Sequence, residues 1–177
     1  MELNEKQISR KNIYECPVFK VFEDKVELPN GHVSTRNIIN HRGGVCIAAL
    51  KDDGNILLVN QFRYVYNEVI LEFPAGKKEL NEDSLETAKR ELIEETGYKA
   101  NSFTYMGKFY PTCGYTNEII DLYFAKDLEY VGQLLDDDEF LNVTEMDLET
   151  IIRLCNDGTI VDGKTMALAY KVKELMK

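Results

Sequence analysis

The sequence has few residues of the kind that bind zinc and no apolar run long enough to cross a membrane. Its cysteines, Cys16, Cys46, Cys113 and Cys155, are far apart without paired zinc-ligand spacing, and it has only two histidines. A membrane-spanning helix needs roughly 18 consecutive apolar residues, which no segment approaches. The first residues also lack the apolar core of a secretory signal. These absences predict a cytoplasmic protein with free thiols and no membrane partner.

Basic residues are in deficit as well. The chain has 21 Lys and Arg against 31 Asp and Glu, which gives a formal net charge of −10. Proteins normally bind a nucleic acid backbone through a basic stripe, so this charge argues against a DNA or RNA partner. The same charge would repel a pyrophosphate substrate unless divalent cations occupied the carboxylates and inverted the local potential. A phosphorylated substrate would therefore require a metal.

The first third of the chain alternates strand-forming segments with turn signals. Asn30-Gly31 and Asp53-Gly54 lie between such segments and favour tight hairpins. A length of 177 residues suggests one structural unit. The predicted strands cover residues 18–28, 32–40, 44–50, 55–62, 69–73, 102–110 and 119–128, and two closing helices cover 147–158 and 163–177.

Residues 76–98 carry a spacing of glycines, acids and one arginine that is too particular for an ordinary surface helix. The fixed positions are Gly76, Glu82, Arg90, Glu91, Leu92, Glu94, Glu95 and Gly97. Asp83 is suited to cap a helix over 84–96, with Glu86 as its capping-box partner, and Gly97 is suited to end it. The segment therefore predicts a glycine-containing loop followed by an acidic helix.

At about 100° per residue, Glu91 and Glu95 fall on the border of the inward face of this helix, one turn apart. The inward stripe consists of Leu85, Ala88, Leu92 and Thr96. Crowded carboxylates raise one another's pKa, whereas hard oxygen ligands so spaced suit Mg²⁺ or Mn²⁺. Gly76 permits a tight turn that frees the carbonyl of Ala75 as a third ligand. The alternative is an ordinary acidic helix, with solvated glutamates and an Arg90–Glu94 pair.

This pattern resembles the Nudix hydrolase signature, and the flanking segments resemble the branch that hydrolyses ADP-ribose and nucleoside diphosphate sugars. The resemblance implies an α/β (α+β) fold, a Nudix-type α/β/α sandwich with a mixed central sheet over residues 41–177. An N-terminal antiparallel β extension is expected over residues 1–40. The implied cofactor is Mg²⁺, with Mn²⁺ as the alternative. The implied products are a nucleoside monophosphate and a sugar phosphate.

The resemblance also implies substrate contacts. Arg63 ends a Gln-Phe-Arg segment like the one whose arginine contacts substrate in that branch, although an ordinary surface charge is the alternative. Thr112 and Gly114 lie where the branch has a substrate loop, and Lys77 follows the first glycine of the signature. Cys113 replaces a proline associated with ADP-ribose hydrolases, so the preferred sugar stays open. Relatives are commonly dimers that exchange N-terminal strands, and Arg36 matches an arginine that reaches the partner's site.

Catalytic candidates follow from the same resemblance. Glu139 is the leading candidate for the general base and a further metal ligand, and Asp137 of the same acidic loop is the second. Glu118 is a third carboxylate at the spacing usual in the branch. Glu94 and Arg90 complete the set, with Arg90 orienting the acids. Two other functions stay open: hydrolysis of a nucleoside triphosphate or dinucleoside polyphosphate, and non-catalytic nucleotide binding on the same fold.

Overall fold

The computed structural model describes residues 2–135 and 139–177 and divides into two compact units. The first unit comprises Met1–Gly43 and Tyr110–Ile119, and the second comprises Gly44–Phe109 and Ile120–Lys177. Asp137, a predicted base, lies outside the described residues.

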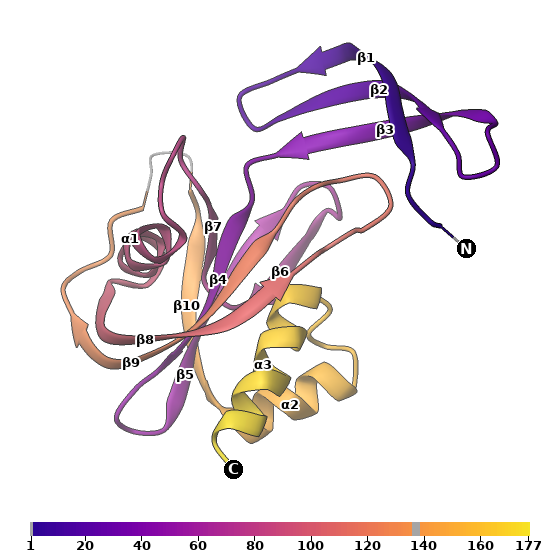
Figure 1. Ribbon diagram of the computed structural model, residues 1–177. Helices are drawn as coiled ribbons and strands as arrows, with labels where there is room; N and C mark the ends of the chain where they lie inside the picture. Colours follow the sequence, from indigo (N-terminus) through magenta and orange to yellow (C-terminus); the bar gives the residue numbers. More distant parts are fainter. Residues whose placement is uncertain (1, 136–138) are drawn as a thin grey trace. The chain divides into compact units, whose positions relative to one another are not determined.

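The first unit contains a three-stranded antiparallel sheet in the order β1-β2-β3 (Figure 1). Its strands are β1 (Lys6–Glu15), β2 (Phe19–Glu27) and β3 (Val33–His41). Asp24 on the central strand is buried and accepts two hydrogen bonds from Arg10 of β1, at 2.8 and 2.7 Å. Strand β1 lies within the β extension expected over residues 1–40, but it was not predicted as an individual strand because its exposed residues show no alternation of apolar and polar side chains.

The second unit is built on a mixed sheet in the order β10-β5-β4-β9-β8. Strand β6 pairs with β5, and β7 pairs with β4. Strands β4 and β9 run parallel, while the other recorded pairs in this sheet are antiparallel. The strands are β4 (Gly44–Leu50), β5 (Asn55–Arg63), β6 (Glu68–Glu72), β7 (Ala75–Lys77), β8 (Tyr98–Phe109), β9 (Ile120–Tyr130) and β10 (Leu141–Asp147).

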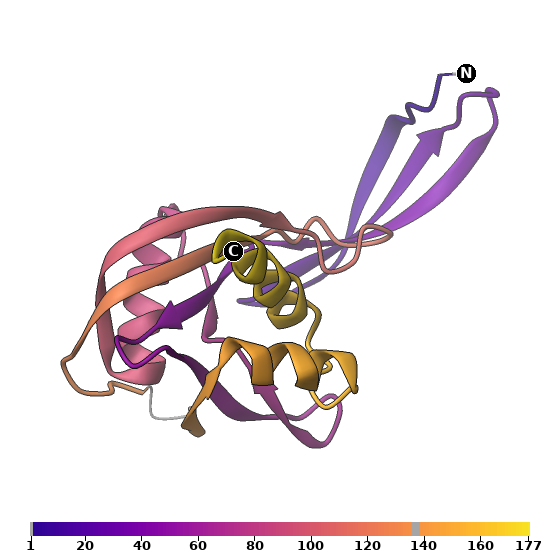
Figure 2. The ribbon, with the colours of Figure 1, turned by 90° about the horizontal axis from the view of Figure 1, so that it is seen from below.

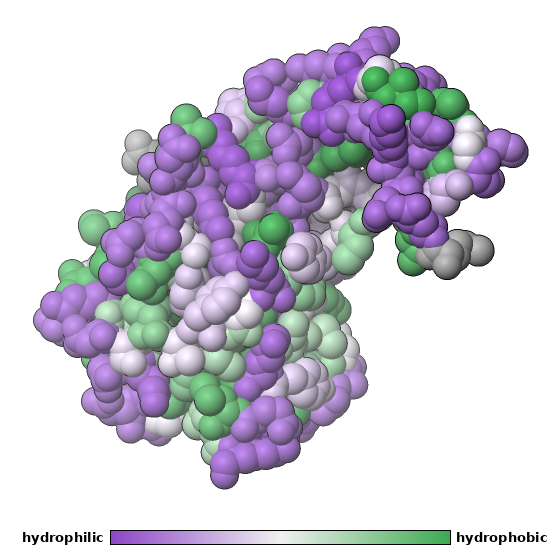
Figure 3. Space-filling view, in the orientation of Figure 1, coloured by the Kyte–Doolittle hydropathy of each residue, from purple (hydrophilic) through white to green (hydrophobic). Residues whose placement is uncertain are grey.

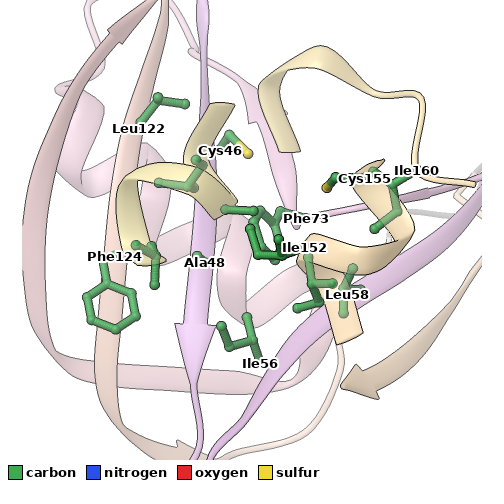
Figure 4. Packing of buried hydrophobic residues seen from close by; sticks show 14 of the residues in the cluster. Cys46, Ala48, Ile56, Leu58, Phe73, Leu122, Phe124, Ile152, Cys155 and Ile160 are labelled. Atoms are coloured by element: carbon green, nitrogen blue, oxygen red, sulfur yellow. The ribbon is translucent and has the colours of Figure 1, made fainter. Parts of the chain in front are cut away.

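Helices cover both faces of this sheet (Figures 1 and 2). Helix α1 (Ser84–Thr96) packs on one face, where Ala88 and Leu92 are fully buried. Helices α2 (Leu148–Asn156) and α3 (Gly163–Leu175) pack on the other. On that second face, side chains from the helices and the sheet form a cluster that includes Phe73 (Figure 4). The predicted α/β/α sandwich with a mixed sheet is therefore confirmed.

Hydrophilic residues dominate the face of the molecule in Figure 3, and hydrophobic residues are scattered among them. In the part of the chain that the structure describes, no helix is both long and apolar enough to span a bilayer. Cys16, Cys46, Cys113 and Cys155 are free in the structure.

Candidate active site

Helix α1 begins and ends where the sequence predicted. The side chain of Asp83 accepts a hydrogen bond from the backbone N–H of Leu85 at 2.9 Å, so Asp83 caps the helix. Gly97 has a φ of 79°, and its N–H donates to the carbonyl of Ile93. Glu86 forms an ion pair with Lys89 rather than closing a capping box. The helix is thus fixed at both ends.

The two carboxylates predicted to bind metal are deeper in the protein than their border position suggested. Glu91 is 8% exposed and Glu95 is 3% exposed. Burial raises the pKa of Glu91 to about 7 and that of Glu95 to about 8. The negative charge of Glu139 is one of the smaller causes of both raised pKa values. A bound divalent cation would favour the ionised form of such carboxylates, so these residues fit the metal that the motif implies.

Strand β7 brings a backbone segment against these carboxylates. It pairs with β4 in the register Val45 to Gly76 and Cys46 to Ala75. The N–H of Ala75 donates to Glu95 Oε2 at 2.9 Å. A Cβ atom on Gly76 would lie 2.0 and 2.1 Å from the carboxylate oxygens of Glu91, so only glycine leaves room for that carboxylate. The structure therefore brings Ala75, Glu91 and Glu95 together. Within residues 2–135 and 139–177, no group of three or more Asp, Glu, His or Cys side chains is arranged so that it could hold a metal ion by itself.

Arg90 connects the loop of the motif to its helix. Its Nε and Nη2 donate to the two carboxylate oxygens of Glu82, each at 3.0 Å. Its Nη1 donates to Glu91 at 2.9 Å and to Glu94 at 2.8 Å. Its Nη2 also donates to the carbonyl of Lys77. The hydrogen bond from Arg90 lowers the pKa of Glu82 to about 2. One guanidinium thus holds three carboxylates and the end of β7.

Arg63 lies at the end of β5 and is held by Glu72, with Nε and Nη2 donating at 2.6 and 2.8 Å. Glu72 is 2% exposed and also forms an ion pair with Lys164 of α3. Arg63, Glu72 and Lys164 line a cavity of about 420 Å³ together with Tyr66, Glu68, Ile70, Val161, Asp162 and Gly163. Arg63 was predicted from the sequence, whereas Glu72 and Lys164 were not, because their contact joins residues 92 positions apart.

A further pair of contacts holds the segment that leads to Glu139. The side-chain Nε2 of Gln133 donates to the carbonyl of Glu95 at 2.6 Å, and the N–H of Leu134 donates to the carbonyl of Glu94 at 3.2 Å. Carbonyls near the end of a helix have no partner within the helix, so such contacts satisfy them. No sequence signal marked Gln133, because a glutamine in a loop has no characteristic pattern.

Other predicted site residues belong to the first unit. Arg36 on β3 forms an ion pair with Glu5. Glu118 Oε1 lies 3.5 Å from Nδ1 of His41. Thr112 and Gly114 lie in the segment Tyr110–Ile119 of that unit. The roles of these residues stay predictions.

Comparison with known proteins places the chain in a family. Residues 40–168 match the model of the NUDIX domain. The chain is 39% identical over 175 residues to an ADP-ribose pyrophosphatase from Bacillus subtilis (strain 168), covering 98% of this chain and 93% of the relative. It is 38% identical over 177 residues to a methanol dehydrogenase activator from Bacillus methanolicus, covering 98% of this chain and 96% of that one. The chain therefore belongs to the Nudix hydrolase family.

The fold agrees with that membership. A crystal structure of an ADP compounds hydrolase superposes with a TM-score of 0.87 at 22% sequence identity. The match covers 99% of this chain and 96% of the other. At this identity, the likeness concerns the fold alone.

Proposed function

We propose that the protein hydrolyses the diphosphate linkage of ADP-ribose or a related nucleoside diphosphate sugar and releases a nucleoside monophosphate and a sugar phosphate. The observation that carries this proposal is the pair of buried carboxylates, Glu91 and Glu95, against the backbone of β7. The near full-length similarity to an ADP-ribose pyrophosphatase supports the choice of substrate class.

Glu91, Glu95, the carbonyl of Ala75 and Glu139 would hold Mg²⁺, with Mn²⁺ as the alternative. A divalent cation in such a site neutralises diphosphate charge and lowers the pKa of a bound water. Glu139 is the proposed base that takes the proton of the attacking water, because its acidic loop resembles the loop that supplies the base in the ADP-ribose branch. Asp137 is the second candidate base. Arg90 keeps the carboxylates oriented through its contacts with Glu91 and Glu94.

The cavity beside Arg63 supports a sugar rather than additional phosphates. Arg63 and Lys164 are its two cations, whereas Glu68, Glu72 and Asp162 supply three carboxylates. Both cations already form ion pairs with Glu72. A wall with this charge balance suits a neutral group rich in hydroxyls better than a polyphosphate chain. ADP-ribose is therefore the first proposed substrate and GDP-mannose the second, ahead of nucleoside triphosphates and dinucleoside polyphosphates.

A substrate panel tests this function. Purified protein is incubated with Mg²⁺ and ADP-ribose, GDP-mannose, UDP-glucose, diadenosine polyphosphates or nucleoside triphosphates, with and without EDTA, and the products are separated by chromatography. We expect EDTA-sensitive release of AMP and a sugar phosphate from ADP-ribose. Preferred cleavage of triphosphates would overturn the choice of substrate. An absence of cleavage across the panel would favour non-catalytic nucleotide binding.

The proposed base is tested separately with Glu139→Gln, which removes the proton acceptor and keeps the size of the side chain. We expect a loss of kcat of roughly 10²-fold or more. Full activity in this variant would move the role to Asp137 or Glu118.

A second candidate function is activation of an alcohol dehydrogenase. It is supported by the 38% identity to a methanol dehydrogenase activator along almost the entire chain. The test adds the protein to a purified methanol dehydrogenase with its cofactor and compares dehydrogenase rates with and without the addition. The variant Glu95→Gln separates two routes: activation that needs hydrolysis is lost, whereas activation by binding alone persists. An unchanged dehydrogenase rate would remove this candidate.

We further propose that residues 1–40 form a dimerising extension and that the protein works as a cytoplasmic homodimer. Large apolar side chains are exposed on this extension, among them Ile8, Ile13 and Val33. Arg36 of one subunit would then reach the partner's site. Sedimentation equilibrium tests the dimer, and a monomer at micromolar concentration would exclude it.

Cell fractionation tests the proposed cytoplasmic location, for which the free cysteines favour a reducing compartment.

A further inference from the structure

The loop between β7 and α1 is attached to strand β9 at both of its ends. At the start of the loop, Nζ of Lys78 donates to Oδ2 of Asp121. At its end, Oγ of Ser84 lies 2.7 Å from the hydroxyl of Tyr123, a hydrogen-bond distance. Asp121 and Tyr123 are two positions apart on β9, so their side chains extend from the same face of the sheet. Both partners therefore hold the loop on the α1 side.

Asp121 is a buried anchor rather than a surface charge. It is 6% exposed, and its second carboxylate oxygen accepts a hydrogen bond from the hydroxyl of Tyr105 at 3.0 Å. The side chain of Lys78 is itself only 20% exposed. Separating Lys78 from Asp121 would leave a buried carboxylate without its cation, which would strongly destabilise the fold. The ion pair therefore holds the loop firmly at Lys78.

The register of the sheet links this anchor to the proposed catalytic centre. Val45 on β4 lies opposite Gly76 of β7 on one side and opposite Asp121 of β9 on the other. Gly76 and Asp121 thus occupy one row across three strands. Because Lys78 follows Gly76 by two residues, the ion pair fixes the chain directly after the backbone that borders Glu91.

On its other side, the loop is attached to helix α1 through Arg90. Glu82 of the loop accepts two hydrogen bonds from Arg90, which also binds Glu91 of the helix. A shift of the loop would move Glu82 and release Arg90 from its present orientation. The position of the Glu91 carboxylate therefore depends on where the loop is held.

We propose that Asp121 is a positioning residue for hydrolysis: through Lys78 it holds the loop so that Glu82 orients Arg90 and Arg90 orients Glu91. This role rests on the proposed function. Asp121 acts through other residues and contacts no reacting group. Its loss should therefore lower kcat more than it raises KM, because the contacts it displaces orient Glu91, whereas the proposed substrate contact Arg63 is held separately by Glu72.

The kinetic test compares Asp121→Asn with Glu129→Gln. Glu129 is on the same strand and forms an exposed ion pair with Lys99, so it controls for loss of a carboxylate from β9. For Asp121→Asn we expect kcat to fall roughly ten- to a hundred-fold, because small misplacements of catalytic groups carry costs of this order. KM should stay within about two-fold, and Glu129→Gln should match the wild type. Lys78→Arg, which keeps the cation, should retain most of the activity.

A second readout does not depend on activity. The NMR signal of the Arg90 Nε–H reports its hydrogen bond to Glu82. We expect Asp121→Asn to shift or broaden this signal, while the Nε–H signal of Arg10, which binds Asp24, stays in place. If Asp121→Asn does not fold, the kinetic and NMR measurements are made on the double variant Lys78→Met, Asp121→Asn. This variant removes both charges of the ion pair and so leaves no buried charge without its partner.

Either an unmoved Arg90 signal or an unchanged kcat overturns the proposal. If the wild type cleaves no compound of the panel, the proposed function fails. In that case the Arg90 signal alone decides whether Asp121 positions the loop.

Discussion

A Cβ atom added to Gly76 would lie 1.8 Å from the carboxylate carbon of Glu91. The contact is with the end of a flexible side chain rather than with backbone, so a larger residue displaces the carboxylate more readily than it distorts β7. The glycine therefore leaves room for one of the two buried acids of the proposed catalytic centre, and this suggests a way to separate folding from activity.

Gly76→Ala should lose activity while keeping its fold. We expect kcat to fall by roughly 10²-fold or more, because Glu91 moves away from Glu95. Thermal unfolding should show a small loss of stability, and this loss should disappear when Gly76→Ala is made in a Glu91→Ala background. A loss that persists in that background would place the strain in the backbone instead.

Glu95→Gln tests the proposed metal ligand. Glutamine keeps an oxygen that accepts from the N–H of Ala75, and it removes a charge that burial disfavours. We expect kcat to fall by several orders of magnitude with little change in the unfolding midpoint, measured by steady-state kinetics and urea denaturation. Glu86→Gln on the exposed side of the same helix is the matched control. Retained activity in Glu95→Gln would refute the metal assignment.

The parts of the site that could be predicted from the sequence are those whose conformation depends on residues close by in the chain. Asp83, Gly97 and the helical period define α1 because capping and side-chain direction depend on neighbouring residues. Strand β10 was missed because its strand character comes from pairing with β5, whose partner residues, from Gln61 for Leu141 to Asn55 for Asp147, lie 80 to 92 positions earlier in the chain.

The burial of the acids was also underestimated. A helical projection places Glu91 at the border of the inward face, but β7 and the loop cover that border in the folded protein. The ion pair of Lys78 with Asp121 likewise joins residues 43 positions apart, and no local pattern indicates it. Contacts of this kind follow from strand order, which the sequence pattern did not specify.

Glu72→Gln should destabilise the protein in a pH-dependent way. Burial raises the pKa of Glu72, but Arg63 and Lys164 outweigh burial and lower it below its usual value of 4.5. A lowered folded-state pKa means that ionised Glu72 stabilises the fold above pH 4.5 and that this contribution is lost as the pH falls through the lower value. The substitution should cost about 3 kcal/mol at neutral pH, because it removes the carboxylate that binds Arg63 and leaves Lys164 with Asp162 alone.

Urea unfolding of the wild type and Glu72→Gln at neutral pH and at progressively lower pH checks this expectation. The difference in free energy of unfolding should narrow as the pH falls below 4.5. Glu149→Gln, which removes an exposed partner of Lys173, should show little difference at either pH. If the difference in free energy of unfolding between the wild type and Glu72→Gln stayed constant with pH, the effect of the substitution would come from packing rather than from charge.

Arg90→Lys isolates the shape of the guanidinium from its charge. Arg90 donates hydrogen bonds to both carboxylate oxygens of Glu82 and to Glu91 and Glu94. A single ammonium group cannot form these hydrogen bonds with the same geometry. We therefore expect kcat to fall roughly ten- to a hundred-fold although the charge is unchanged. Arg153→Lys, the same substitution at an exposed position of α2, should leave kcat unaltered. If Arg90→Lys retained full kcat, the positive charge alone would be enough to hold Glu91 and Glu94 in place. The bidentate hydrogen bonding to Glu82 would then contribute to the stability of the loop rather than to catalysis.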